Sequence, residues 1–259
     1  MKLERAPATL PLTREQFIAQ ILTITGDTRL FWLPKNTDTT TSIDESLNAR
    51  VITYDATIAA QFSKVGLGDA VSFNGTSDYG TVPDAANLSF GTGVADIAFS
   101  LVTLAKVTDT AAVRTIMAKR NTSALAREWE WHIATNDTLV LGLYDESVDL
   151  EPFRQSNAAI TQGTWKLFGA SYDGTGGATA ADGIILYQDG LSLASTATNM
   201  ALYVAMEDTT GQLTIGVRNA ATNDALMSGD MAMNLIVAKV LTASEMWAIY
   251  QTCRGYFNL

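Results

Sequence analysis

The sequence predicts an all-β protein built as a sandwich of two sheets, with a short helix near each end. Three observations carry this prediction. The chain has 259 residues, a length that one β-sandwich domain often has. Short runs rich in β-branched and aromatic residues recur along it, separated by turns of Gly, Asn and Asp. Hydrophobic residues make up 47% of the chain, which is enough to bury a core and excludes disorder over its whole length.

The first expected element is a helix over residues 12–25. Thr13 stands three residues before Gln16, which is the spacing of a capping box. The apolar stripe of this helix consists of Phe17, Ile18, Ile21 and Leu22. A helix this short is marginal alone in water, so either the sandwich or a partner must cover the stripe. We favour a partner, and expect residues 1–28 to form an anchoring arm ahead of a domain at residues 29–259.

A series of strands follows the first helix. They are expected at 30–33, 50–54, 70–73, 79–82, 98–105, 138–144, 165–172, 183–188, 212–217 and 231–240. Asp189-Gly190 comes directly after one of these strands and is a hairpin turn signal. A second helix begins after Thr242, with Glu245 at the capping-box position. No composition shift divides this part of the chain, so we expect a single domain.

The charge balance limits the partners. Lys and Arg total 17 against 27 Asp and Glu, which gives a formal net charge of −10. Such a chain repels phosphates, so we expect neither nucleic acid nor a membrane as partner. No stretch approaches the roughly 18 consecutive apolar residues of a membrane span, and the N-terminal segment lacks the apolar core of a secretory signal. One cysteine, Cys253, and one histidine, His132, exclude an intrachain disulfide and a multi-histidine metal site.

Several segments, in sequence order, resemble the concanavalin A-like (laminin-G-like) jelly-roll family. The segment Lys64–Tyr79 resembles its opening block, where a Gly-x-Gly turn leads into a strand ending in Phe-Asn-Gly. Trp165–Gly174 resembles its strand ending in Tyr-Asp-Gly, and Leu186–Gly190 resembles its hairpin. Leu213–Gly216 and the segment from Ser228 to Glu245 continue the match. The resemblance covers most of the chain after the first helix and implies a concanavalin A-like β-sandwich jelly roll.

The segment Glu128–His132 is the strongest candidate for catalysis. Strand alternation puts Glu128, Glu130 and His132 on one face and the intervening tryptophans on the other. Carboxylates at i and i+2 can reach the separation of about 5–5.5 Å that a retaining glycosidase needs. Glucanases with this architecture carry a further Glu where this chain has His132 or Ile133. We therefore interpret the segment as a framework strand with a polar outer face over a Trp-rich core, and expect no catalytic residue.

Calcium is the one cofactor that we consider. Asp44 resembles an acid near the start of the family sequence that can contribute to a metal site, but its family partner falls near Ala232, where this chain has no carboxylate. A second candidate cage consists of Asp145, Glu146, Asp149 and Glu151, which is more often a solvated loop. We therefore expect no metal, with calcium at Asp44 as the alternative.

Trp32 and Trp129 are the candidates for stacking on sugars. Trp165 and Trp247 occupy positions that usually pack the core in this family. The resemblance, together with the general character of the sequence, favours a non-enzymatic structural protein of a bacteriophage virion: a capsid decoration, head-fibre or tail-associated protein. Such a protein assembles in the host cytoplasm, contacts other virion proteins and forms a homo-oligomer. The alternative is an adhesion module that binds a cell-surface polysaccharide.

Overall fold

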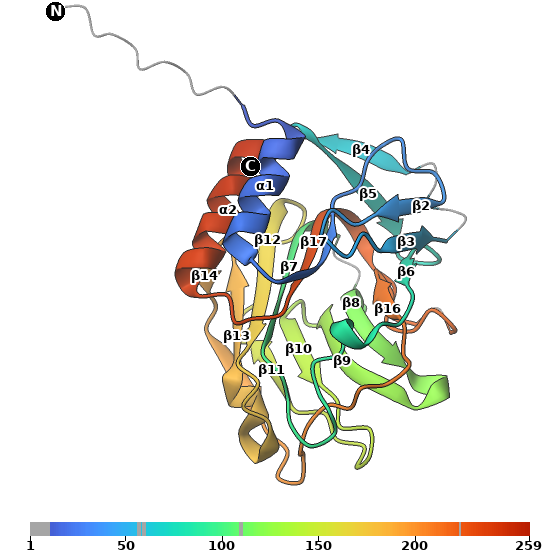
Figure 1. The fold of residues 1–259 in the computed structure, drawn as a ribbon, viewed down its shortest axis with the longest axis vertical. Helices are drawn as coiled ribbons and strands as arrows, with labels where there is room; N and C mark the ends of the chain where they lie inside the picture. Colours follow the sequence, from blue (N-terminus) through green and yellow to red (C-terminus); the bar gives the residue numbers. More distant parts are fainter. Residues whose placement is uncertain (1–10, 56–57, 59–60, 109–110, 223) are drawn as a thin grey trace, which may run out of the picture.

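The computed structural model describes residues 11–55, 58, 61–108, 111–222 and 224–259. Within these residues, the strands form two antiparallel sheets that pack face to face, and two α-helices lie outside one of them (Figure 1). The predicted fold class is therefore confirmed: the protein is an all-β sandwich with a short helix near each end.

The first sheet has eight strands in the order β14-β13-β12-β7-β17-β5-β4, and β1 pairs with β17 beside this path. Their bounds are β14 Leu191–Ser192, β13 Ile184–Gln188, β12 Trp165–Tyr172, β7 Phe99–Val107, β17 Ser228–Val237, β5 Gly68–Asn74, β4 Phe62–Val65 and β1 Thr28–Trp32. Strands β7 and β17 form its centre.

The second sheet has nine strands in the order β15-β11-β10-β9-β8-β16-β6-β3-β2. Their bounds are β15 Ser195–Thr198, β11 Phe153–Ser156, β10 Leu139–Leu143, β9 Ala126–Ile133, β8 Arg114–Asn121, β16 Leu213–Ile215, β6 Gly80–Val82, β3 Val51–Tyr54 and β2 Thr41–Ile43. Short 3-10 turns occur at η2 Ala86–Leu88, η3 Thr122–Ala124 and η4 Gly177–Gly183. The main hydrophobic core fills the space between the two sheets.

Most of the predicted strands are present with small shifts at their ends. Strand β12 has the predicted bounds, and the Asp189-Gly190 turn joins β13 to β14 with φ values of 52° and 78°. Both central residues of a two-residue hairpin of this kind need positive φ, which explains Gly at the second position. Strands β2, β4, β8, β11, β14 and β15 were not predicted, because they are short or rich in polar residues.

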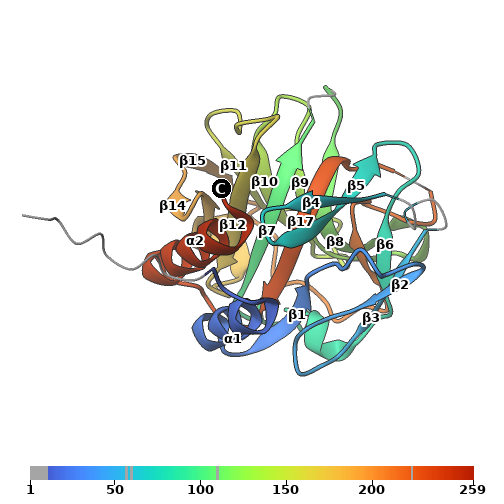
Figure 2. The same cartoon turned by 90° about the horizontal axis from the view of Figure 1, so that it is seen from above.

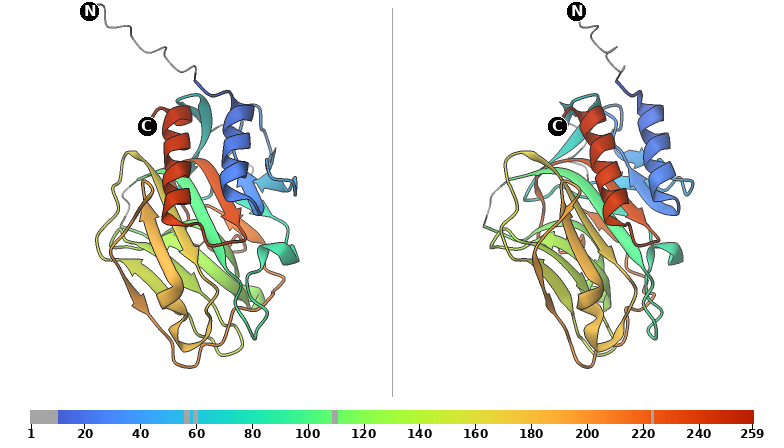
Figure 3. Two further views of the ribbon diagram at one scale, coloured as in Figure 1. Left: turned by 60° about the vertical axis from the view of Figure 1, so that its left-hand side comes forward. Right: turned by 90° about the vertical axis from the view of Figure 1, so that its left-hand side faces the viewer.

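The two α-helices form a third layer. Helix α1, Arg14–Thr25, and helix α2, Ala243–Phe257, lie side by side over the eight-stranded sheet (Figures 2 and 3). Each starts with the predicted capping box, in which the N-cap threonine and the side chain three residues later bond each other's backbone amides. Neither helix is long and apolar enough to span a membrane, within the residues that the structure describes.

The apolar stripe of α1 packs on the same chain, and our expectation that a partner covers it is wrong. Phe17 and Ile21 are fully buried in the cluster between the helices and the eight-stranded sheet. The ring of Phe17 stacks on Tyr256 of α2, with centroids 4.3 Å apart. Ile18 and Leu22 are partly buried against the same cluster. The cause is the C-terminal helix, whose aromatic end supplies the surface that a short amphipathic helix needs.

The arm prediction extends beyond what the structure describes. Residues 1–10 of the expected arm lie outside the described residues. Strand β1 begins at Thr28, close to the expected boundary between residues 1–28 and 29–259. The division itself stays a prediction, although α1 shares its core with α2.

Among the residues that the structure describes, the outer face of the nine-stranded sheet is the one broad sheet face that no α-helix covers. Side chains on both faces of the eight-stranded sheet are buried, toward the other sheet on one side and toward the helices on the other. This explains the nearly unbroken burial along β7 and β17, in contrast to the alternation along β3. The outer face of the nine-stranded sheet is therefore open to a ligand where its side chains are exposed.

Candidate functional site

A continuous row of paired residues crosses the outer face of the nine-stranded sheet. Side chains alternate along each strand, so directly paired residues share a face. From β3 to β15 the row consists of Thr53, Thr81, Thr214, Ala118, Glu130, Gly142, Phe153 and Thr198. The face thus has a carboxylate at its centre, flanked by two small residues, and a stretch of threonines toward β3.

A groove of about 480 Å³ lies at the threonine end of this row. Its lining residues are Thr53, Tyr54, Asp55, Tyr79, Thr81, Gln212, Ala220 and Ala221. Thr53 and Thr81 are direct partners in the pairing of β3 with β6. The amide of Asp55 donates to the carbonyl of Tyr79 at 2.9 Å, which joins the two walls. The groove offers hydroxyl, amide and carboxylate groups beside the half-buried ring of Tyr79.

None of these lining residues was singled out from the sequence. They come from three regions of the chain, around residues 53–55, 79–81 and 212–221, and the pairing of β3, β6 and β16 brings these regions together. The one available signal was the alternation in Val51–Tyr54, where Thr53 stands between two buried residues. That pattern indicates an outward face, but it does not reveal which strands lie beside it.

The two tryptophans expected to stack on sugars are both buried. Trp32 lies in the core and its Nε1 donates to the hydroxyl of Tyr54 at 2.9 Å. Trp129 lies in the core against Phe99, with ring centroids 5.9 Å apart. A buried indole cannot stack on a sugar, so both assignments are wrong. Conversely Trp247, expected to pack the core, is 44% exposed on α2.

Glu130 is the centre of an ion-pair cluster on the outer face. Its Oε2 lies 2.7 Å from Nη1 of Arg120, and its Oε1 lies 3.0 Å from Nδ1 of His132 and 3.8 Å from Nη1 of Arg218. Burial raises the pKa of Glu130, but the bond to His132 and the positive charges of Arg120 and Arg218 outweigh it. The net pKa is lowered, so the cluster holds this buried carboxylate in its charged form.

Glu151 adds a second carboxylate to the cluster. Its Oε2 lies 3.8 Å from Nη1 of Arg120, the same nitrogen that pairs with Glu130. The side chain packs over Gly142, where a Cβ atom would come within 2.6 Å of Oε1. Burial, followed by the negative charge of Glu130, raises the pKa of Glu151. The two neighbouring carboxylates therefore have pKa values shifted in opposite directions.

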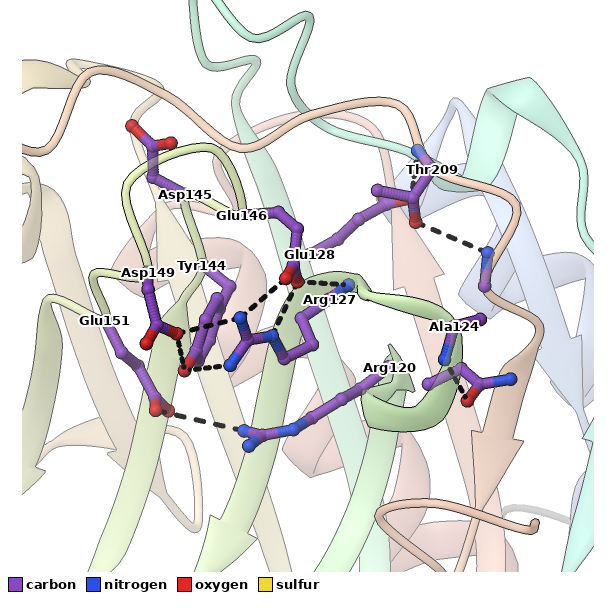
Figure 4. Close-up of polar contacts among 12 residues, drawn as sticks. Arg120, Ala124, Arg127, Glu128, Tyr144, Asp145, Glu146, Asp149, Glu151 and Thr209 are labelled. Carbon is purple, nitrogen blue, oxygen red and sulfur yellow. Dashed lines mark hydrogen bonds and ion pairs between the residues drawn. The ribbon is translucent and has the colours of Figure 1, made fainter.

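Arg127 pairs with two carboxylates of the acidic loop after β10 (Figure 4). Its guanidinium bonds Glu146 at 2.5 and 2.6 Å and pairs with Asp149 at 2.8 Å. It also lies over the ring of Tyr144, 4.0 Å from the centroid. The loop was one of the two candidate calcium cages. Arg127 engages Glu146 and Asp149 of this loop, whereas Asp145 accepts hydrogen bonds from the hydroxyl of Ser147 and the amide of Val204.

The expected orientation of the Glu128–His132 segment is confirmed for its apolar side, because Trp129 and Trp131 lie in the core. On the polar side, however, Glu128 is fully buried and Glu130 is nearly so, so both glutamates are covered by other parts of the chain. The Oε1 of Glu128 accepts from Nζ of Lys119 at 2.6 Å and from the amide of Thr209 at 2.8 Å. Burial raises its pKa, and Lys119 partly opposes the shift. This carboxylate fixes the loop before β16.

Asp44 has a local structural role. Its Oδ1 accepts from the amide of Ser46 at 2.7 Å, and its Oδ2 accepts from the amide of Arg50. Among the described residues, no group of three or more His, Cys, Asp or Glu side chains is arranged to hold a metal ion. The expectation of no metal, with calcium at Asp44 as the alternative, stays untested.

Comparison with known proteins identifies the fold. No family model matches the chain. No curated protein matches its sequence. Its structure is similar to the binding domain of Paraclostridial Mosquitocidal Protein 1, with 10% identity, a TM-score of 0.64, and coverage of 88% of this chain and 52% of that one. The present chain therefore spans about half the length of that domain.

Two further structures share the fold. One is Domain 4 of AbnA, a GH43 extracellular arabinanase from Geobacillus stearothermophilus, in complex with arabinotriose: 17% identity, TM-score 0.57, and coverage of 87% of this chain and 98% of that one. The other is the ligand binding domain of Botulinum neurotoxin serotype D in complex with N-Acetylneuraminic acid: 12% identity, TM-score 0.61, and coverage of 90% and 52%. At these identities the similarity is one of fold.

Proposed function

We propose that this chain is a non-catalytic carbohydrate-binding module that takes a glycan into the groove over β3, β6 and β16. The lining of the groove carries this proposal. Sugars present paired hydroxyls and apolar C–H faces, and they need hydrogen-bonding groups beside an aromatic ring. The hydroxyls of Thr53 and Thr81 and the amide of Gln212 supply the hydrogen-bonding groups, and the ring of Tyr79 supplies the aromatic surface.

The groove favours a neutral glycan. Among the residues that line it there is one carboxylate, Asp55, and neither Lys nor Arg. An anionic sugar such as a sialic acid would find no Lys or Arg among these lining residues to pair with its carboxylate. A pentose or hexose oligosaccharide carries no such penalty.

Two of the similar structures support this class of ligand. The arabinanase domain is in complex with arabinotriose, and this chain covers 98% of that domain. The neurotoxin domain is in complex with N-Acetylneuraminic acid, although this chain covers only 52% of it. The arabinanase domain is the better guide, because the whole of it corresponds to the present fold.

The arrangement of the acidic side chains supports a non-catalytic role. Glu128 is fully buried and bonded to Lys119 and Thr209, and Glu130 is almost fully buried within its ion-pair cluster. A glycosidase needs two carboxylates that reach the scissile bond. Neither of these carboxylates is presented to a substrate.

The test is isothermal titration calorimetry with arabinotriose and a panel of neutral oligosaccharides. Binding should be saturable, and Tyr79→Ala and Gln212→Ala should each weaken it by about tenfold, which corresponds to about 1.4 kcal/mol. The matched control is Gln20→Ala, an exposed glutamine on α1 in the helical layer. Equal affinity of the groove variants and the control, or no binding to any neutral glycan, would contradict the proposal.

A place in a bacteriophage virion, with assembly into a homo-oligomer in the host cytoplasm, rests on the sequence alone. It is compatible with glycan binding, because a virion protein can itself be adhesive. Mass spectrometry of purified particles and the molar mass in solution test this second role. Absence of the chain from particles would remove it without affecting the proposal for the groove.

A further inference from the structure

Three loops at one end of the sandwich carry exposed aliphatic side chains. We call this set the end-loop patch; it consists of Val94, Ile97, Val148, Leu202 and Val204. Val94 is 80% exposed and Leu202 is 75% exposed, and the other three are between 45% and 49% exposed. In Figure 1 these loops gather at the lower end of the molecule, opposite the end where helix α2 finishes. Exposed apolar patches of this kind often mark interaction surfaces.

Hydrogen bonds tie the three loops together. The amide of Gly93 donates to the carbonyl of Met206 at 2.7 Å. The amide of Met206 donates to Oδ1 of Asp96 at 2.7 Å, and that of Val204 donates to Oδ2 of Asp145 at 3.0 Å. The hydroxyl of Tyr203 also donates to Asp96, at 2.9 Å. The patch is therefore held in place in the free chain, and binding there costs little ordering entropy.

The same loops are strongly acidic. Residues 91–98, 145–150 and 199–209 contain no Lys or Arg. Their carboxylates are Asp96, Asp145, Glu146, Asp149, Glu207 and Asp208. Arg127 from β9 pairs with Glu146 and Asp149, whereas Asp208 is exposed. Asp145 is buried and Asp96 is hydrogen-bonded within the loops, so the negative charge at the surface beside the aliphatic side chains comes mainly from Glu207 and Asp208, with Glu146 and Asp149 partly offset by Arg127.

We propose that the end-loop patch binds a protein segment that combines an apolar ridge with Lys and Arg beside it. Charge complementarity selects this partner, since the negative charge beside the patch attracts a basic surface. A second copy of this chain is disfavoured as the partner, because it would bring two acidic ends together and each copy carries a net charge of −10. A membrane surface is disfavoured because the patch lacks the Trp, Tyr, Lys and Arg side chains that sit at lipid interfaces.

The test uses a synthetic amphipathic helix with Leu on one face and Lys on the other, titrated into the full chain by fluorescence anisotropy. The double variant Val94→Ser/Leu202→Ser should weaken binding by about tenfold or more, because two aliphatic contacts are lost. The variant Asp208→Asn should lower the affinity less, and its effect should shrink as salt is added. The control variant Leu47→Ser removes an exposed leucine outside the patch.

The comparison of variants separates the patch from general attraction to an acidic protein. Equal affinity of the double variant and the Leu47→Ser control would overturn the proposal, as would equal binding of a scrambled peptide with the same composition. Binding of phosphatidylcholine vesicles in place of the peptide, or a dimer in sedimentation that the double variant loses, would also overturn it. Unchanged melting temperatures of the variants show that the fold is intact. The groove is not involved, so glycan titrations should give the same result for all of these variants.

Discussion

The indole of Trp32 donates a hydrogen bond to the hydroxyl of Tyr54, with 2.9 Å between Nε1 and the oxygen. Trp32 belongs to β1 in the eight-stranded sheet, and Tyr54 belongs to β3 in the nine-stranded sheet. The bond therefore joins the two layers through the core, directly behind the groove that Tyr54 helps to line. Burial raises the pKa of Tyr54, which keeps the hydroxyl protonated at any physiological pH.

Replacing Trp32 with Phe should lower the free energy of unfolding by about 1–3 kcal/mol. The variant keeps an aromatic ring but leaves the buried hydroxyl of Tyr54 without the indole donor. Urea denaturation followed by circular dichroism gives the value. Trp247→Phe, at an exposed tryptophan, is the control and should change stability by less than about 0.5 kcal/mol. Equal stability of both variants would mean that the interlayer bond contributes nothing.

Truncating Phe17 to Ala should destabilise the isolated chain by about 3–5 kcal/mol, because its ring is fully buried against Tyr256 and Phe257. Differential scanning calorimetry measures the effect as a lower Tm. Gln20→Ala on the exposed side of α1 should leave Tm nearly unchanged. An unchanged Tm for Phe17→Ala would restore the idea that α1 is a separate anchor.

Substituting Ala at Gly142 should cost about 1–3 kcal/mol, because the new Cβ would lie within 2.6 Å of Oε1 of Glu151. The displaced carboxylate is the origin of the strain, so the effect should be smaller in a background that carries Glu151→Ala. A double-mutant cycle measures this coupling. Additive effects of the two substitutions would show that the backbone, rather than Glu151, limits the space at Gly142.

Two neighbouring glutamates should affect the pH dependence of stability with opposite sign. The folded state raises the pKa of Glu151, so its stabilising contribution is present at acidic pH and is lost as pH rises through the folded pKa. The folded state lowers the pKa of Glu130, so its contribution is present above the ordinary glutamate pKa and is lost as pH falls through the folded value.

Glu151→Gln should therefore gain stability relative to the parent chain between pH 4 and pH 7, and Glu130→Gln should lose stability over the same range. Urea denaturation at several pH values gives both differences. The same slope for the two variants would contradict the assignment of their pKa shifts. Gln212→Ala, outside the ion-pair cluster, should show no slope.

Local sequence signals predicted the elements that depend on neighbours in the chain. The pairs Thr13/Gln16 and Thr242/Glu245 form the capping boxes that their spacing indicated, and Asp189-Gly190 forms a tight hairpin turn. In each case the residues that make the structure lie within three positions of one another. The resemblance to jelly-roll sequences then supplied the correct fold class.

The candidate site could not be predicted, because it is formed by contacts between strands that are distant in the sequence. The alternation of side chains places Trp129 and Glu130 on opposite faces of the strand, but it does not indicate whether other parts of the chain cover either face. Trp32 was a candidate for sugar stacking because no motif in the sequence indicated that it packs the core, and its contact with Tyr54 joins residues 22 positions apart. The row from Thr53 to Thr198 exists only through register between strands distant in the chain. Likewise, Lys119 and Thr209 bury Glu128 from two separate segments.

The two-sided burial of the eight-stranded sheet has a consequence for amide hydrogen exchange. Amides in the middle of β7 and β17 have no exposed face, so they should exchange with solvent only when the whole molecule unfolds. Strands β2 and β15 are the edges of the other sheet and should exchange through small local openings. The groove and the end-loop patch both lie away from the slowly exchanging centre. A bound ligand should therefore be detected as slowed exchange at the periphery, while the exchange of the central strands reports the stability of the fold.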